Sequence, residues 1–538
     1  MPHESADEIG AGAPFLTRAW WLHPLLLAAF PVIFLFATNI REQITLEPLQ
    51  FPLAMAVAGA AAVIAISAGL SRLVGRSAAR GGLVASLLVA MFFSYGHVWQ
   101  VAEEVLHLHR FLLIAYAAIA VCTVVVVLRA RDTHVRAATG ALNFAGMVLV
   151  GLNLVPIVQF QLADPRSSEA PSAQSTSTPT GVDQGPRRDV WYLVFDRYAG
   201  QDALSTIYGH DNQGFLDELE VRGFQVAEHS TANYLKTALS LRSTLTMDYL
   251  DADALLAAAT TPDDWTPLYR ALQGSNAVEQ FLHGLGYSYV HLGVRRGATY
   301  TNTEADRVLL YDDHTEFSAV LRETTLLVAL ENVLGGDSPG GYAGLYGNHS
   351  LYQFNSLELL ARASSETPRF IFAHFLLPHP PYAFNADGSW VTPEQAAARD
   401  EPEEYIQQLE FTNARVLELL DTLLARPTEE SPIVLIQSDE GPFPTRYARD
   451  EEGFAWAEAT DEELLQKFSI LAAYRVPEVE PADLELYPGI TPVNSFRVIF
   501  NAAFGTDLPL LPDRNLAFVD QRHVYEMIDV TDRLAALR

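Results

Sequence analysis

The chain has 538 residues, a formal net charge of −30 and a slightly positive mean hydropathy of +0.10. The negative charge belongs to the second part of the chain. Residues 1–160 contain 9 Arg, no Lys and 8 acidic residues, whereas residues 161–538 contain 26 basic and 57 acidic residues. An acidic second part repels phosphate backbones, which excludes nucleic acid as an expected partner. The single cysteine, Cys122, excludes a disulfide framework and a cysteine-based zinc site within one chain.

The first part contains five apolar runs, at residues 20–39, 51–71, 81–100, 110–128 and 137–160. Each is close to the ~20 residues that a helix needs to cross a bilayer. No small-residue cleavage site of the A-x-A type lies near the first run, so we expect a retained helix rather than a cleaved signal peptide. Residues 1–160 are therefore predicted to form a five-helix transmembrane domain of an integral membrane protein.

The loops between these runs predict the orientation of the chain. Two alternate loops, residues 72–80 and 129–136, carry three arginines each, and the other loops are acidic or balanced. Arginine-rich loops stay in the cytoplasm. The N-terminus is then inside, and after five crossings the chain emerges outside. We expect a multi-pass protein of the cell (inner or plasma) membrane with an extracytoplasmic C-terminal domain.

Residues 161–188 are rich in Ser, Thr, Pro and Ala without apolar periodicity, which predicts a flexible linker. Beyond it, residues 189–538 alternate short apolar runs with amphipathic stretches. Strands are expected at 190–195, 369–377 and 432–437, and helices near 201–207, 211–222 and 403–426. This alternation predicts an α/β domain with a mostly parallel sheet flanked by helices.

Polar residues follow the ends of the predicted strands, where parallel sheets bind their ligands. Asp196 follows the first strand, His379 the second, and the pair Asp439–Glu440 the third. Singly, Asp196 could cap a helix and Asp439 could form a turn. Together with a hydroxyl-rich stretch at 233–247, they are the components of metal-assisted phosphoryl or sulfuryl transfer, in which a metal activates a hydroxyl nucleophile.

With these residues, the outer domain resembles the alkaline phosphatase/sulfatase superfamily. It looks closest to the membrane-anchored sulfatase-like transferases, the lipoteichoic acid synthases and lipid A phosphoethanolamine transferases. That branch also has five N-terminal helices and an extracytoplasmic catalytic domain. The resemblance covers about residues 189–505 and includes TALS at 237–240, HFLLPHPPY at 374–382 and SDEG at 438–441.

The resemblance implies a role for each matching residue. Thr237 would be the nucleophile, and His379 would contact the substrate or protonate the leaving group. One divalent metal (Mn, Mg, Ca or Zn) would be bound by Asp196, Thr237, Asp439 and Glu440. The substrate would be bound by Lys236, His374 and Arg242. His374 also has a plain alternative as a core histidine, and Lys236 and Arg242 as residues that point away from the site.

Two departures from the family pattern bear on the chemistry. The C/S-x-P-x-R motif that yields formylglycine is absent from the sequence, which disfavours formylglycine-dependent sulfate-ester hydrolysis. Glu440 stands where most relatives have His, which leaves an all-oxygen ligand set better suited to Mg²⁺, Mn²⁺ or Ca²⁺ than to Zn²⁺.

The implied function is transfer of a phosphorylated headgroup, from a membrane lipid, to a surface glycan or lipid. The alternatives are a phosphate or sulfate ester hydrolase and, if Glu440 marks a lost metal, a non-catalytic sulfatase-like domain that binds a glycan or a partner.

Overall fold

The computed structural model describes residues 15–38, 46–106, 109–162, 188–295, 297–311, 316–334, 341–479 and 484–537. The chain divides into two compact units, which we describe separately. The membrane unit comprises residues 1–167 and 314–342, and the outer unit comprises residues 168–313 and 343–538. Most of the predicted linker, residues 163–187, lies outside the described residues.

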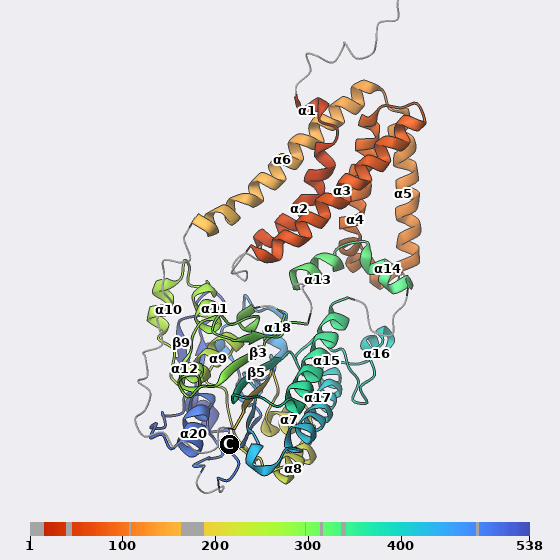
Figure 1. Ribbon diagram of the computed structural model, residues 1–538. Helices are drawn as coiled ribbons and strands as arrows, with labels where there is room; N and C mark the ends of the chain where they lie inside the picture. Colours follow the sequence, from red (N-terminus) through yellow and green to blue (C-terminus); the bar gives the residue numbers. More distant parts are fainter. Residues whose placement is uncertain are drawn as a thin grey trace, which may run out of the picture. The chain divides into compact units, whose positions relative to one another are not determined.

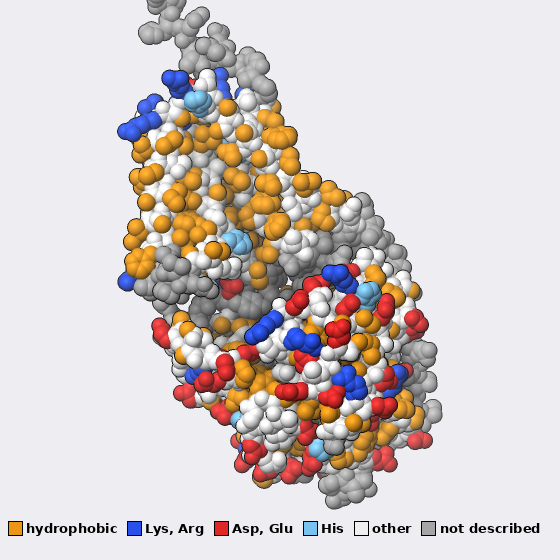
Figure 2. All heavy atoms as spheres, turned by 180° about the vertical axis from the view of Figure 1, so that it is seen from behind, with side chains coloured by type: hydrophobic (Ala, Val, Ile, Leu, Met, Phe, Trp, Pro, Cys, Tyr) orange, Lys and Arg blue, Asp and Glu red, His pale blue; other side chains and the backbone are white. Residues whose placement is uncertain are grey.

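The five apolar runs correspond to five helices of the membrane unit, which follow the short helix α1 (Phe15–Arg18): α2 (Leu22–Thr38), α3 (Glu47–Leu73), α4 (Ala78–Leu106), α5 (His109–Arg129) and α6 (Asp132–Leu162). Four of them, α3 to α6, are long and apolar enough to cross a membrane, whereas α2 is a shorter apolar helix of 17 residues. Apolar side chains dominate the visible face of this unit in Figure 2, and acidic side chains gather on the other unit. The number of crossings stays a prediction.

Two further helices of the membrane unit come from far along the chain (Figure 1). They are α13 (Glu316–Glu323) and α14 (Leu327–Leu334). α13 contacts α2 and α3, and α14 contacts α5. The outer domain expected at residues 189–538 thus includes two helices that pack with the membrane unit. The sequence does not distinguish α13 and α14 from the rest of the outer domain, because they are too short and too mixed in polarity to be predicted as membrane spans.

The outer unit is built on a seven-stranded sheet in the order β2-β7-β6-β1-β5-β3-β4. The bounds are β1 (Val190–Phe195), β2 (Gln225–Val226), β3 (Ser288–Leu292), β4 (Arg307–Val308), β5 (Arg369–Phe375), β6 (Ile433–Gln437) and β7 (Ala472–Arg475). The pairs β6–β1, β1–β5, β5–β3 and β3–β4 are parallel, and β7 is antiparallel to both of its neighbours. The predicted mostly parallel sheet is therefore confirmed.

The central strand β1 is buried on both faces, as its unbroken apolar run predicts. Alternate residues of β1 enter two separate cores. Helices that supply the first core are α9 (Thr237–Thr246), α11 (Thr266–Gln273), α12 (Ala277–Gly284) and α20 (Pro492–Phe504). Those that supply the second are α7 (Gln201–Ile207), α8 (Gln213–Val221), α15 (Gly341–Arg362) and α17 (Glu401–Leu424). The helices predicted near 201–207, 211–222 and 403–426 are α7, α8 and α17.

The remaining elements are short and lie around these layers. They are α10 (Ala252–Ala258), α16 (Pro393–Ala398), α18 (Thr445–Arg449), α19 (Asp461–Phe468), α21 (Thr531–Ala535) and the pair β8 (Leu516–Phe518) and β9 (Met527–Asp529). α19 begins with a capping box formed by Thr460 and Glu463, which fixes its start beside the site described next.

Candidate active site

Three neighbouring strands bring three potential metal ligands together. Asp196 follows β1, His374 lies near the end of β5 and Asp439 follows β6. The Nε2 atom of His374 lies 4.0 Å from Oδ2 of Asp196 and 3.8 Å from Oδ2 of Asp439. All three side chains are buried, and their ligand atoms lie within 4.8 Å of one another. Two ligands of one ion, each bonded at ~2.1 Å, are at most ~4.2 Å apart, so both measured separations suit a shared cation.

The electrostatics of this trio also fit a cation. Among the described residues, Oδ1 of Asp196, Oδ2 of Asp439 and Nε2 of His374 are buried without a hydrogen-bond partner. Burial and the facing carboxylate of Asp439 raise the pKa of Asp196, and burial and Glu440 raise the pKa of Asp439 to about 7. Burial lowers the pKa of His374 to about 3, so its imidazole is neutral, the form that binds metals. A divalent ion would stabilise both carboxylates in their charged form.

A chain of buried polar groups orients His374. Its Nδ1 is 2.7 Å from Oγ1 of Thr299, and its backbone carbonyl accepts a hydrogen bond of 2.8 Å from Nε2 of Gln353. The carbonyl oxygen of Thr299 lies 2.8 Å from Nε2 of His291. Metal-binding histidines are typically held through the second ring nitrogen in this way. The family resemblance implies that His374 binds substrate, whereas the structure groups it with Asp196 and Asp439 as a potential metal ligand.

Thr237 is the first residue of α9 and is half-buried. Its side chain lies beside the carboxylate of Asp439, close enough to oppose the rise in the pKa of Asp439. The N-terminus of a helix carries partial positive charge and unpaired N–H groups, which favour an anion at this position. The predicted nucleophile therefore lies beside a predicted metal ligand and at a point suited to a phosphate.

Glu440 points its carboxylate at cations. Its Oε2 is 2.9 Å from Nζ of Lys467 and its Oε1 is 3.3 Å from Nε of Arg197. Nζ of Lys467 also donates to the carbonyl of Gly441 at 2.8 Å. A Cβ at Gly441 would lie 2.2 Å from the carbonyl oxygen of Gln466, so only glycine permits this close approach between the two segments.

The two lysines of the chain, Lys236 and Lys467, meet at this site. Their Nζ atoms lie 4.2 and 4.1 Å from the ring centroid of Phe443, and the guanidinium of Arg197 lies 3.4 Å from it. Arg197 has a left-handed backbone, with φ of 59°, directly after Asp196. Burial lowers the pKa of Lys236, and it lowers that of Lys467 to about 7 against the opposing effect of Glu440. Lys467 and Arg197 were not predicted, although the rarity of lysine was a signal for Lys467.

Two predicted site residues, Arg242 and His379, are not among the three potential metal ligands. Arg242 is buried in α9, and its Nη1 donates to the carbonyls of Ala271 and Ser275 at 2.6 and 3.0 Å. The bond to Ala271 links α9 to α11, and a substrate-binding role for Arg242 stays a prediction. His379 is half-buried in the loop after β5, where Nε2 of Gln408 donates to its carbonyl at 2.9 Å. His379 is outside the trio of potential metal ligands.

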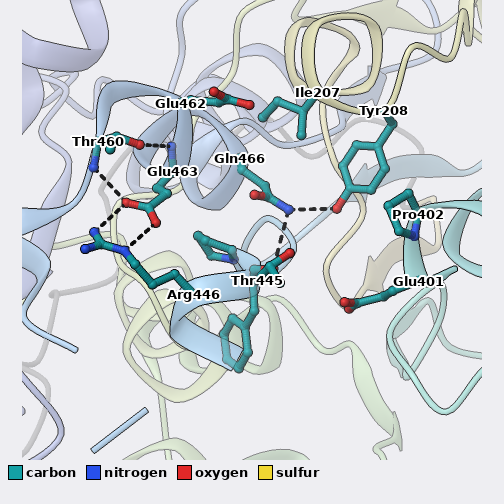
Figure 3. Close-up of a pocket in the computed structure, with 12 residues that line it drawn as sticks. Ile207, Tyr208, Glu401, Pro402, Thr445, Arg446, Thr460, Glu462, Glu463 and Gln466 are labelled. Carbon is teal, nitrogen blue, oxygen red and sulfur yellow. Dashed lines mark hydrogen bonds and ion pairs between the residues drawn. The ribbon is translucent and has the colours of Figure 1, made fainter. Parts of the chain in front are cut away.

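A pocket of about 360 Å³ shares Phe443 with this cluster (Figure 3). Its wall includes the aromatic rings of Tyr208 and Phe443 and the carboxylates of Glu401 and Glu462. Nε2 of Gln466 donates to the Tyr208 hydroxyl at 2.9 Å across the pocket. The Glu463 carboxylate is neutralised by Arg446 at 2.8 Å, whereas the described residues offer no ion pair to Glu401 or Glu462. The pocket therefore carries negative charge next to a cluster of three cationic side chains, those of Arg197, Lys236 and Lys467.

No protein-family model matches the sequence. No curated protein sequence matches it either. Among solved structures, the fold is similar to the C-terminal periplasmic domain of EptC from Escherichia coli, with 12% identity over 66% of this chain and 96% of that chain and a TM-score of 0.42. It is also similar to the phosphonate monoester hydrolase of Agrobacterium radiobacter, with 11% identity over 62% and 80% and a TM-score of 0.38.

A similarity that includes the membrane unit is found with the integral membrane protein lipooligosaccharide phosphoethanolamine transferase A from Neisseria meningitidis. It covers 89% of this chain and 95% of that chain, with 12% identity and a TM-score of 0.37. Phosphoethanolamine transferases are one of the classes of protein that the sequence resemblance named. Because the TM-scores are below 0.5, function has to be inferred from the residues of this chain's own site.

Proposed function

We propose that this chain is a membrane enzyme that moves a phosphorylated headgroup from a lipid to a surface glycan or lipid, or hydrolyses such a bond. The observation that carries the proposal is the position of Thr237 beside Asp439, one of the potential metal ligands, and near both lysines of the chain. A hydroxyl, a metal-capable trio and cations in one place are the components of phosphoryl transfer.

The proposed reaction has two displacements at phosphorus. In the first, a bond forms between Oγ of Thr237 and phosphorus while the bond from phosphorus to the donor's alcohol oxygen breaks, and the threonine proton ends on that departing oxygen. In the second, the hydroxyl of the acceptor attacks phosphorus, its proton is released, and Thr237 regains its hydroxyl. Water in place of the acceptor gives the hydrolase alternative.

Asp196, Asp439 and His374 would hold one divalent metal, which when bound would polarise the phosphoryl oxygens and lower the pKa of the attacking hydroxyl. An imidazole among the ligands favours Zn²⁺ over Mg²⁺, Mn²⁺ or Ca²⁺. Glu440, expected from the sequence as a ligand, would instead serve as the counter-ion of Lys467. Lys467 and Lys236 would offset charge on the transferring phosphoryl group.

The pocket beside Phe443 supports a headgroup that also carries a positive charge. Carboxylates of Glu401 and Glu462 together with the aromatic face of Tyr208 suit an ammonium group. An aminoalkyl phosphate, such as a phosphoethanolamine group, has its phosphate and its cation in adjacent positions. The expected extracytoplasmic location of the outer unit, with a lipid donor from the membrane, is part of the same proposal.

The test uses the purified full-length protein with a fluorescent phosphatidylethanolamine in mixed micelles, in the presence of Mn²⁺ or Zn²⁺. We expect release of fluorescent diacylglycerol and a phosphorylated adduct on Thr237 in the intact-mass and peptide spectra. Thr237→Ala should abolish both signals. Thr246→Ala, at the other end of α9 with its hydroxyl bonded to the carbonyl of Arg242, should retain them.

Full activity in Thr237→Ala would overturn the nucleophile assignment. Absence of both turnover and adduct in the unmodified protein, with any of Mn²⁺, Zn²⁺, Mg²⁺ or Ca²⁺, would favour the non-catalytic alternative.

A further inference from the structure

The helices α13 and α14 lie between β4 and α15 in the sequence, yet they pack on the membrane helices. Leu321 of α13 enters a core cluster with Phe36 of α2 and Leu49 of α3. Ala329 of α14 is fully buried with Tyr95 of α4 and Leu112 of α5. The polypeptide that builds the outer unit therefore leaves it, joins the membrane unit and returns.

The turn between the two helices bonds to α4 through its backbone. The N–H of Gly96 donates to the carbonyl of Thr324 at 3.0 Å, and the N–H of Leu326 donates to the carbonyl of Phe92 at 2.8 Å. A Cβ at Gly96 would lie 1.9 Å from the carbonyl oxygen of Glu323 and 2.7 Å from backbone atoms of Thr324. Glycine at position 96 is thus a condition for this contact.

The depth of the contact can be worked out from the helices. Gly96 lies 16 residues beyond Arg80 in α4, which is ~24 Å along the helix axis. Leu112 lies 17 residues before Arg129 in α5, which is ~26 Å. Arg80 and Arg129 belong to the loops predicted to face the cytoplasm. Both helices place the contact near the opposite boundary of a hydrocarbon core that is ~30 Å thick.

The backbone hydrogen bonds between the α13–α14 turn and α4 are those that a turn at this depth in the membrane needs. Backbone groups of a turn at the edge of the hydrocarbon region have no water with which to form hydrogen bonds. The hydrogen bonds with Phe92 and Gly96 provide partners for one N–H and one carbonyl of the turn. On the outward side of α14, Leu327 and Leu330 are 37% and 43% exposed. They are three residues apart and share one face of the helix, and the neighbouring helix α5 exposes Ile114 to 66%.

We propose that α13 and α14 form a hairpin embedded in the membrane boundary opposite the arginine-rich loops, with Leu327 and Leu330 in contact with lipid. The occupant of this apolar face is the bilayer, because the face continues the lipid-facing surface of α5 at the depth where that surface ends. The hairpin gives the outer unit an attachment to the membrane in addition to the segment at 163–187. This proposal is independent of the chemistry proposed for Thr237.

The test uses full-length protein with Cys122→Ala and one introduced cysteine that carries the dye NBD. The protein is reconstituted in vesicles of phosphatidylethanolamine and phosphatidylglycerol, with or without a doxyl-labelled phosphatidylcholine that quenches NBD. Leu330→Cys is compared with Ile114→Cys, a lipid-facing position, and with Leu359→Cys, a 70% exposed leucine on α15 of the outer unit. We expect quenching at 330 comparable to that at 114 and none at 359.

A second comparison tests the docking itself. Gly96→Ala should reduce quenching at 330, whereas Gly151→Ala, where a Cβ would meet nothing within 4 Å, should leave it unchanged. The proposal is overturned if the dye at 330 escapes quenching and reacts with water-soluble dithionite as fast as the dye at 359. It is equally overturned if protection at 330 disappears on dilution of the protein in the vesicles, because the occupant is then a second copy.

Discussion

Replacing Glu440 by glutamine separates two roles for this carboxylate, counter-ion and metal ligand. In the structure its two oxygens lie at Lys467 and Arg197, and the Lys467 and Glu440 side chains are 0% and 2% exposed. Removal of one partner of a buried ion pair destabilises a protein by about 3–5 kcal/mol, because the other charge remains buried. We expect the lower end, about 3 kcal/mol, because Lys467 keeps its hydrogen bond to the carbonyl of Gly441.

The assay is chemical unfolding of the full-length protein in detergent, together with metal analysis of the same samples. The double variant Glu440→Gln, Lys467→Met should recover most of the lost stability, with a coupling free energy of about 2 kcal/mol. Asp461→Asn is the control, since its partner Arg533 and Asp461 are 40% and 57% exposed. An exposed pair of this kind contributes about 0–1 kcal/mol.

The counter-ion role also predicts that Glu440→Gln retains its bound metal. The reasoning is wrong if the variant loses the metal while its free energy of unfolding is unchanged, or if the added Lys467→Met brings no recovery. Either outcome would return Glu440 to the ligand set that the family resemblance implied.

Three further outcomes are expected. His374→Ala should lose the divalent metal, by elemental analysis, while circular dichroism shows a folded protein; full metal content would remove His374 from the site. Gly441→Ala should abolish turnover because its Cβ would meet the carbonyl of Gln466 at 2.2 Å, whereas Gly214→Ala, with nothing within 4 Å, should be as active as the unmodified protein. Burial lowers the pKa of His291 and of His349 to about 4, so the unfolded chain takes up their protons first as the pH falls. The free energy of unfolding is therefore highest above pH ~6.5 and falls by roughly 3 kcal/mol for each histidine as the pH is lowered to 4. Denaturant titrations that give the same free energy of unfolding across this range would contradict the prediction.

Much of the sheet could be predicted because its central strands are uninterrupted apolar runs. β1, β5 and β6 are visible in the sequence, and the residues just past their ends, Asp196 and Asp439, do meet at one edge. The edge strands β2 and β4 have two residues each, which is too short for any periodic pattern. Parallel strands place their carboxyl ends together, so the convergence of the two carboxylates follows from the chain direction alone.

The partners within the site could not be derived in the same way. Whether Glu440 faces a metal ion or the side chain of Lys467 depends on how closely the SDEG segment approaches the end of α19. Gly441 and Lys467, which meet there, are 26 residues apart along the chain. That approach depends on Gly441, whose role is visible only once Gln466 is placed beside it. The sequence did contain one signal for Lys467, since Lys467 and the predicted Lys236 are the two lysines among 35 basic residues.

The hairpin of α13 and α14 also constrains the order of assembly. A chain synthesised from its N-terminus produces α2 to α6 first, but the partner surfaces of Phe36 and Tyr95 are supplied by residues more than 200 positions later. The membrane helices therefore cannot complete their packing until much of the outer unit has been exported. An outer domain expressed alone as residues 189–538 would carry the hairpin without its partners, leaving Leu321 and Ala329 uncovered. Removing residues 314–342 from such a fragment should make it more soluble, a practical route to crystals of the site.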